Sequence, residues 1–203
     1  MRTTRDDNEQ LAGEIRHQLQ RTGLQLVCAE SCTAGLVAAT LAQWPGISGW
    51  LCGSWVVYQT DIKHQWLGID SQLLNDPQIG PVSREVTALL AQAAMERTPQ
   101  ATLAVAVTGH LGPGAPVELD GMAYVAIARR DSEKRAPVQE GVRLMVERRV
   151  SLSSVGDFCD IGNESDNRFD AQRAKRLARM DRAVNEVLRT LKEFLQSHPS
   201  ATK

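Results

Sequence analysis

The chain has 203 residues, a formal net charge of −1, 42% hydrophobic residues and 23% charged residues. The composition is typical of a globular protein. The net charge excludes a strongly basic protein whose overall charge attracts nucleic acid. No apolar run approaches the ~20 residues of a membrane-spanning helix. The first ten residues are charged and lack the apolar core of a signal peptide. We therefore expect a cytoplasmic protein with neither membrane nor nucleic acid among its partners.

The first half of the chain predicts helices that alternate with strands. Leu11, Ile15 and Leu19 recur at four-residue steps, which indicates a helix from about residue 8 that Gly23 ends. Residues 1–7 are expected to be a disordered tail. The elements expected next are a buried strand over 24–29, a buried helix over 33–44, a strand over 50–58, a short helix over 60–67, a loop over 70–82 and a helix capped by Ser83.

The second half predicts more strands and one long helix. Expected elements are a buried strand over 101–107, an irregular loop over 110–121, two strands over 122–128 and 141–152 joined by a hairpin connection over 131–140, a polar stretch over 156–167, a helix over 169–196 and a tail over 198–203. The order indicates an α/β fold, a three-layer α/β/α sandwich with a mixed sheet, in a single domain over 8–197.

Three polar loops follow three of the predicted strands, over 29–35, 58–63 and 108–114. Loops at the carboxyl ends of parallel strands share one edge of a sheet, and ligands bind at that edge. If the three strands are parallel neighbours, Ser31, Tyr58, Lys63 and Thr108 converge. The sequence thus predicts one site built from all three loops.

A serine and a lysine at such an edge fit acyl transfer. Ser31 needs a base, and a lysine whose pKa is lowered by burial can serve in place of histidine. Tyr58 would relay the proton or orient the lysine, and amides at the start of the 33–44 helix would hold the oxyanion. From pattern alone each residue has a plain alternative: a helix cap for Ser31, a solvated lysine for Lys63 and a packed strand-end aromatic for Tyr58.

Neighbouring residues have their own alternatives. Glu30 is an orienting residue or a buried carboxylate paired with an N–H, and the alternative is a capping or surface acid. Cys32 is a rival nucleophile that nothing nearby marks as a thiolate. The glycine-rich loop after Thr108 can approach a phosphate, or it is simply rich in turns. The scattered histidines and the cysteine spacing predict no metal site. The basic run Arg168, Arg173, Lys175, Arg176, Arg179 and Arg182 is expected to be a solvated helix face rather than a phosphate or RNA site.

The segment from Ala29 to Gly35 resembles the AESCTGG signature of the CinA C-terminal family, which includes the nicotinamide mononucleotide amidases. The resemblance continues through Gly53 to Tyr58, then Lys63, Leu67-Gly68, Val82-Ser83 and Thr108-Gly109 with Gly112-Pro113. It implies a cytoplasmic α/β protein, a homo-oligomer with a dimer favoured, that hydrolyses the carboxamide of nicotinamide mononucleotide without metal or cofactor. The implied catalytic residues are Ser31, Tyr58 and Lys63. The implied substrate-binding residues are Glu30, Thr33, Gly35, Thr108, Gly109, Gly112 and Arg176.

Several substrate-facing positions depart from the family pattern. Ala34 stands where the signature has a glycine, Thr60 lies where the family has asparagine, and His110-Leu111 replaces a smaller pair. The chain is expected to be a divergent, stand-alone member. The alternative is a non-catalytic or substrate-shifted paralogue that binds a nucleotide or a protein partner.

Overall fold

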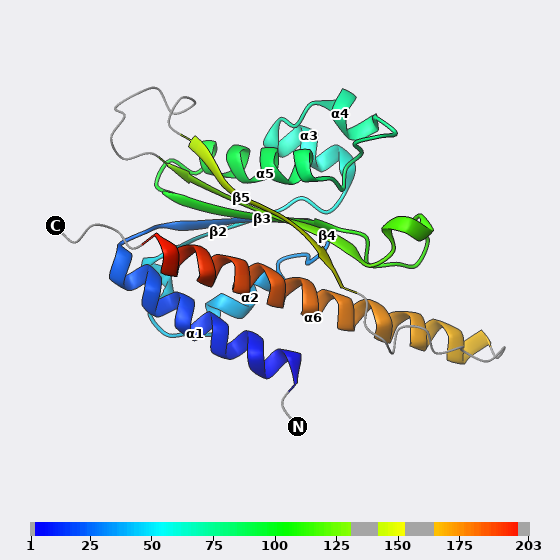
Figure 1. The fold of residues 1–203 in the computed structure, drawn as a ribbon, viewed down its shortest axis with the longest axis horizontal. Coiled ribbons are helices and arrows are strands. Elements are labelled where there is room, and N and C mark those ends of the chain that lie inside the picture. Colours follow the sequence, from blue (N-terminus) through cyan, green and yellow to red (C-terminus); the bar gives the residue numbers. More distant parts are fainter. Residues whose placement is uncertain (1–2, 131–141, 153–164, 199–203) are drawn as a thin grey trace.

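A five-stranded mixed sheet forms the centre of the molecule (Figure 1). The computed structural model describes residues 3–130, 142–152 and 165–198. The strands lie in the order β2-β1-β3-β4-β5. Strand β1 pairs in parallel with both β2 and β3, whereas β3–β4 and β4–β5 are antiparallel. Their bounds are β1 Leu26–Glu30, β2 Leu51–Val56, β3 Leu103–Gly109, β4 Met122–Arg130 and β5 Val142–Ser151.

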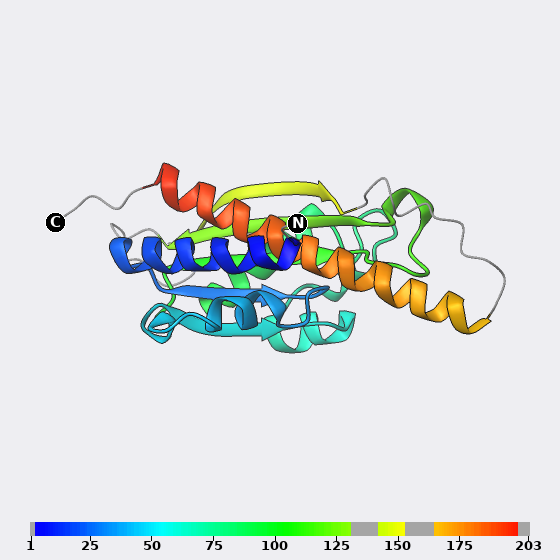
Figure 2. The same ribbon diagram turned by 90° about the horizontal axis from the view of Figure 1, so that it is seen from below.

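Helices cover both faces of this sheet, which confirms the predicted three-layer α/β/α sandwich. Helices α1, α2 and α6 lie on one face and α3, α4 and α5 on the other (Figure 1). Seen from below, α1 and α6 lie side by side (Figure 2). The helices are α1 Thr4–Thr22, α2 Leu36–Ala42, α3 Thr60–Leu67, α4 Ser71–Asn75, α5 Arg84–Glu96 and α6 Ser165–Ser197, with short 3-10 turns η1 Ile47–Gly49 and η2 Val117–Leu119.

The strands are apolar on both sides because both faces of the sheet are covered. In β3, Leu103 and Val105 pack toward α1, α2 and α6, whereas Ala104 and Ala106 pack toward α5. Successive side chains of a strand point to opposite faces, so a continuous apolar run serves both layers. The small alanines on the α5 side match the alanine-rich stripe of α5 itself.

Two predictions near the amino terminus and in the 70–82 loop were wrong. Helix α1 begins at Thr4, so residues 4–7 are helical rather than a tail. The side chain of Thr3 accepts a hydrogen bond from the amide of Asp6, and the Asp6 carboxylate accepts one from the amide of Thr3. This capping box supplies the missing partners of the first turn. The predicted 70–82 loop contains α4, which Asp70 caps.

Other boundaries shift by a few residues. Helix α2 begins at Leu36 because residues 31–35 form a turn, and α6 begins four residues earlier than expected. The predicted connection over 131–140 lies outside the described residues, as does 156–164 of the predicted polar stretch; residues 165–167 belong to α6. In the described ranges, no helix has both the length and the apolar character needed to cross a bilayer.

Candidate active site

The carboxyl ends of β1, β2 and β3 meet at one edge of the sheet, as predicted from the three loops. Glu30, the last residue of β1, stands opposite Val56 of β2 and Val107 of β3. The ladder continues one residue further, because the Ser31 amide donates to the Val107 carbonyl at 3.1 Å and the Val57 amide donates to the Glu30 carbonyl at 2.8 Å. Ser31 is therefore held firmly where β1 turns toward α2.

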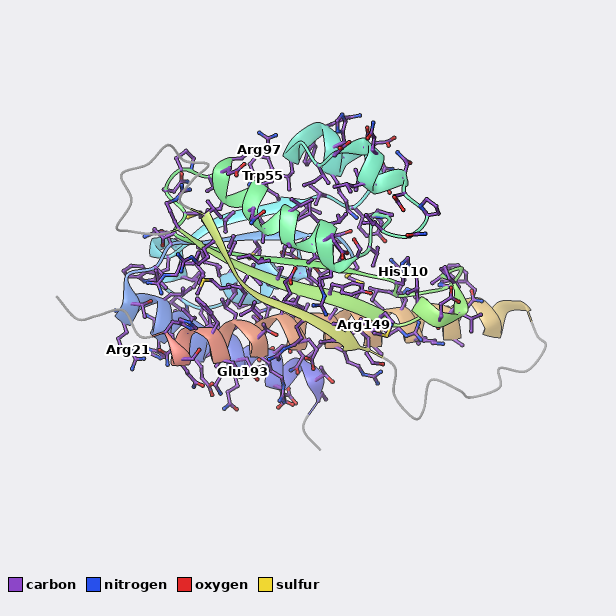
Figure 3. The ribbon with its side chains drawn as sticks, turned by 45° about the horizontal axis from the view of Figure 1, so that its top comes forward. Arg21, Trp55, Arg97, His110, Arg149 and Glu193 are labelled. Atoms are coloured by element: carbon purple, nitrogen blue, oxygen red, sulfur yellow. The ribbon has the colours of Figure 1, made fainter. Side chains whose placement is uncertain are left out.

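A cavity of about 300 Å³ opens at this edge. Six of the ten predicted site residues line it: Ser31, Tyr58, Lys63, Gly109, Gly112 and Arg176. Thr60 and His110, two of the departures from the family pattern, line it as well. In Figure 3, His110 lies at the end of the sheet, where the loop after β3 begins.

Lys63 is buried with its ammonium group inside the protein. Its side chain comes from α3, is 2% exposed and donates a hydrogen bond from Nζ to the Pro81 carbonyl at 2.7 Å. Burial lowers the pKa of Lys63 from 10.5 to about 8. A lysine with such a pKa is partly neutral near physiological pH and can accept a proton. The solvated-lysine interpretation of Lys63 was wrong.

Tyr58 and Arg176 join two loops across the cavity. Arg176 of α6 donates from Nη2 to the Tyr58 hydroxyl and from Nη1 to the Gly112 carbonyl, each at 2.5 Å. Tyr58 is 51% exposed, so it is not a packed core aromatic. Its hydroxyl is thus engaged by Arg176, and the predicted relay between Ser31 and Lys63 is not formed in this structure.

Four predicted substrate-binding residues, Glu30, Thr33, Gly35 and Thr108, are not among the residues that line the cavity. The buried Glu30 carboxylate accepts hydrogen bonds at 2.7–3.0 Å from five groups: the Thr33 and Ser54 hydroxyls and the amides of Gly35, Val37 and Ala38. It therefore organises the turn and the amino terminus of α2. Thr108 is fully buried, and its hydroxyl pairs with that of Thr87 at 2.7 Å.

The Glu30 network also changes the predicted oxyanion site. The amides of the first turn of α2 donate to Glu30, and the Leu36 amide donates to the Thr33 carbonyl. These donors are occupied, so of the amides at the start of the predicted 33–44 helix, only that of Thr33 is left as a candidate to hold an oxyanion. The amides of Cys32 and Thr33, the two residues that follow Ser31 in the chain, are not among the donors of this network.

Arg179 and Asp120 hold the glycine-rich loop, and sequence reasoning missed both. Arg179 is 1% exposed and donates to both carboxylate oxygens of Asp120, at 2.6 and 2.9 Å, and to the Leu111 carbonyl at 3.3 Å. This hydrogen-bonded ion pair lowers the pKa of Asp120. Gly112 has a φ of +69°, and a Cβ there would approach the Asp120 carboxylate to 2.8 Å. Only glycine fits both conditions.

The solvated-face prediction for the basic run was wrong at three positions. Arg176 and Arg179 contact the glycine-rich loop, and Arg182 donates to the Leu152 carbonyl at 2.6 Å. A signal for the first two was present in the sequence. Arg176 and Arg179 precede Met180 and Ala183 at helical spacing and so continue the apolar stripe of α6 onto the sheet.

Asp120→Asn is expected to lower the free energy of unfolding by about 3 kcal/mol, because the buried Arg179 guanidinium loses the negative charge of a carboxylate that both its terminal nitrogens contact. Urea unfolding of the variant measures this. Lys175 is the matched control, since its ammonium lies 3.5 Å from Asp120 in a more exposed pair. Lys175→Met should cost less than about 1 kcal/mol. Equal losses in the two variants would contradict the assigned role of Arg179.

Cys32 lines the cavity beside Ser31, but its thiol is a poor nucleophile here. Burial, the dominant effect, raises the pKa of Cys32 to about 12 even though Lys63 lies close enough to lower it. The thiolate is therefore negligible at neutral pH. We expect Cys32→Ala to keep any hydrolytic turnover within a few-fold of the parent chain in a steady-state assay. Loss of turnover in this variant, with the fold retained, would make Cys32 the nucleophile.

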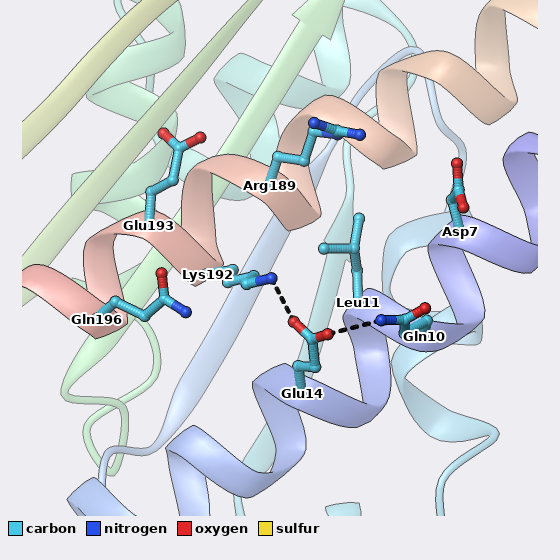
Figure 4. A pocket seen from close by; sticks show the side chains of 8 residues that line it. All are labelled: Asp7, Gln10, Leu11, Glu14, Arg189, Lys192, Glu193 and Gln196. Carbon is cyan, nitrogen blue, oxygen red and sulfur yellow. Dashed lines mark hydrogen bonds and ion pairs between the residues drawn. The ribbon is translucent and has the colours of Figure 1, made fainter.

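A second hollow, of about 390 Å³, lies between α1 and α6 rather than at the sheet edge (Figure 4). Charged groups of both signs line it, and Lys192 pairs with Glu14 across it. Because its charges compensate one another, it offers no concentrated field for a charged ligand. Among the described residues, no cluster of three or more His, Cys, Asp or Glu is arranged to hold a metal ion.

The comparisons with known proteins agree with this fold. The family model of the CinA C-terminal domain matches residues 8–153, so the chain belongs to the CinA C-terminal domain family. A CinA-like protein of Prochlorococcus marinus is 37% identical over 139 residues, 68% of this chain but only 32% of that protein. The nicotinamide-nucleotide amidohydrolase PncC of Pseudomonas putida is 32% identical over 159 residues, 76% of this chain and 96% of that protein.

Solved structures give the same result for the fold. The competence/damage inducible protein CihA of Agrobacterium tumefaciens aligns with a TM-score of 0.67 and 30% identity, covering 91% of this chain and 95% of that one. The competence damage-inducible protein A of Klebsiella pneumoniae aligns with a TM-score of 0.69 at 20% identity over 93% of this chain and 97% of that one, a likeness of fold alone.

Proposed function

We propose that this protein is an amidohydrolase that converts nicotinamide mononucleotide to nicotinate mononucleotide and ammonia, with Ser31 as nucleophile. The observation that carries the proposal is one cavity that holds the Ser31 side chain, a buried Lys63 with a pKa of about 8 and Arg176. The relative from Pseudomonas putida, named a nicotinamide-nucleotide amidohydrolase, supports the same reaction class.

The charge of the cavity supports an anionic substrate. Lys63 and Arg176 line it, and among its described lining residues there is no Asp or Glu. Cationic groups in a partly dehydrated cleft attract phosphate and carboxylate groups strongly. A nucleoside monophosphate fits this requirement. The Arg176 guanidinium, now bonded to Tyr58 and Gly112, would exchange one of these partners for the phosphate.

The proposed reaction begins with attack of the Ser31 oxygen on the amide carbon. Neutral Lys63 takes the hydroxyl proton and passes it to the departing nitrogen, so that the C–N bond breaks and ammonia leaves. The acyl group remains on Ser31 until water hydrolyses the ester. The amides of Cys32 and Thr33, which take no part in the Glu30 network, would donate to the negative charge that develops on the carbonyl oxygen.

A second candidate is binding of a nucleotide without turnover. It is favoured by two hydrogen bonds: Lys63 donates to the Pro81 carbonyl, and Tyr58 pairs with Arg176. Neither bond connects the nucleophile to its base. Catalytic hydrogen bonds in ligand-free enzymes often form only in the substrate complex, so a functional measurement must decide between the two.

Ammonia release from nicotinamide mononucleotide tests the proposal, with Ser31→Ala as the blank. We expect ammonia release above that of Ser31→Ala at saturating substrate. If no such release is found, the proposed amidase activity is wrong. A thermal shift with the same nucleotide is recorded in parallel. A ligand that binds only the native state raises the stability of that state by mass action. A higher melting temperature with nucleotide, but no ammonia release, would therefore support nucleotide binding without turnover.

The assembly and location predicted from the resemblance stay predictions. We propose a homo-oligomer, with a dimer favoured, in the cytoplasm. Sedimentation equilibrium of the full chain measures the oligomeric state. A monomer at micromolar concentration would contradict the proposed homo-oligomer.

A further inference from the structure

The imidazole of His110 lies at the cavity, and the structural role of this residue does not involve that side chain. The peptide group of His110 already has a structural role: its amide donates to the Met122 carbonyl, and its carbonyl accepts from the Gly121 amide, each at 2.8 Å. These bonds would be made by any residue. The side chain is half-buried and lines the same cavity as Ser31 and Lys63. Within the part of the chain that the structure describes, the ring nitrogens have no hydrogen-bond partner.

The surroundings keep this imidazole neutral. Burial lowers the pKa of His110 from its usual 6.5, and the nearby Lys63 ammonium lowers it further, against an opposing effect of Asp120. The charged or titratable groups around the ring come from four elements: Cys32 after β1, Tyr58 and Lys63 from the β2–α3 segment, Asp120 before β4 and Arg176 of α6. Near pH 7 the site therefore holds a free base, His110, beside a mostly protonated Lys63.

We propose that His110 is a further catalytic residue, the base that removes a proton from the water that hydrolyses acyl-Ser31. The inference rests on the proposed function, because it needs an ester on Ser31. Its physical basis is the placement of an unengaged imidazole and a serine nucleophile in one cavity. A positioned imidazole commonly accelerates such a step by about 10²–10⁴-fold.

The step balances without any other reactant. A water O–H bond breaks, its proton goes to an imidazole nitrogen, and the oxygen forms a bond to the acyl carbon. The bond between that carbon and the Ser31 oxygen then breaks, and the imidazolium returns the proton to this oxygen. A carboxylic acid and free Ser31 result, and the acid loses its proton to solvent.

The two steps should respond differently to pH. Acylation depends on neutral Lys63 and rises with pH up to about 8. Deacylation depends on neutral His110, so it should be flat from pH 7 to 9 and fall only under more acidic conditions, below the usual imidazole pKa. Different pH profiles for two steps of one active site indicate two different bases.

The test uses the full chain and p-nitrophenyl acetate, so that it does not depend on the nucleotide. Nitrophenolate release measures acylation, and intact-protein mass spectrometry follows the decay of acetyl-Ser31, with Ser31→Ala as the blank. In His110→Asn we expect acylation to be nearly unchanged and deacylation to slow by about 10²-fold. Added imidazole should restore it. His17→Asn, an exposed histidine on α1, is the matched control and should change neither step.

Equal slowing of both steps in His110→Asn, or deacylation at the parental rate, would overturn the inference. So would the lack of an acetyl group on Ser31 in the parent chain, since no ester would then exist to hydrolyse. A slow-deacylating His110→Asn variant in a protein that releases no ammonia from nicotinamide mononucleotide would uphold the role of His110 and reject the proposed substrate alone.

Discussion

Lys63→Met is expected to reduce ammonia release by about 10³-fold and, at the same time, to make the protein more stable. The activity falls because the only buried amine lining the cavity, among the residues that the structure describes, is removed. Stability rises because the folded protein no longer holds a dehydrated ammonium group. Opposite effects on rate and stability are typical of a residue kept for function rather than for folding.

The sign of the stability change follows from the lowered pKa. Folding disfavours the charged form of Lys63, and that cost is complete below about pH 8, shrinks between pH 8 and 10.5 and vanishes above. At about 1.4 kcal/mol per pKa unit, the shift from 10.5 to about 8 corresponds to about 3 kcal/mol. Loss of the hydrogen bond to the Pro81 carbonyl offsets about 1 kcal/mol of it.

Two measurements check this expectation. Urea unfolding at pH 7 should give a Lys63→Met variant more stable than the parent by about 2 kcal/mol, with the gap closing above pH 10. Lys63→Arg is the matched control: a guanidinium stays charged, so this variant should lose both activity and stability. An active Lys63→Arg variant would show that a positive charge, rather than a base, is what the site requires.

Glu30→Gln is expected to lower the free energy of unfolding by about 4 kcal/mol or more, an exceptional loss for one atom exchanged. Each carboxylate oxygen of Glu30 accepts at least two hydrogen bonds. In glutamine an NH₂ group replaces one of these oxygens, and because NH₂ cannot accept, the groups that donate to that oxygen would lose their acceptor. Buried donors left unpaired cost about 1–3 kcal/mol each. Activity should fall too, because Ser31 sits directly on the turn that this carboxylate holds.

Ser54→Ala is the matched control for Glu30→Gln, since it removes one of the five donors and leaves the carboxylate in place. It should cost about 1 kcal/mol. Urea unfolding of both variants makes the comparison. If Glu30→Gln stays within 1 kcal/mol of the parent, the carboxylate is not the organising group of the β1–α2 turn.

Local patterns predicted the architecture because they reflect local physics. The apolar run over 101–107 had to be a strand buried on both faces, and Ser83 does cap α5, its hydroxyl accepting from the Val86 amide at 3.2 Å. The parallel pairing of β1 with two neighbours then brought Ser31, Tyr58 and Lys63 to one edge. The order of strands and loops along the chain was sufficient to predict that these three residues share one edge of the sheet.

The distant partners of Glu30 and Arg179 could not be predicted, although a buried, orienting carboxylate at Glu30 was expected. Glu30 bonds the hydroxyl of Ser54, 24 residues away, and Arg179 bonds Asp120, 59 residues away. Ala34 was predicted to face the substrate, yet it is not a cavity-lining residue. Its φ of +52° lies in the left-handed region, so a glycine at that position of the signature relieves backbone strain rather than making room for a ligand.

The nature of the covalent adduct tests the central claim most directly. The chain would be mixed with nicotinamide mononucleotide, quenched with acid within the first turnover, and digested for peptide mass spectrometry, in the parent and in Cys32→Ala. An acyl-nucleotide ester on Ser31 in both proteins, and none in Ser31→Ala, is the predicted result. A thioester on Cys32, or ammonia released in the first turnover with no adduct on any residue, would contradict it.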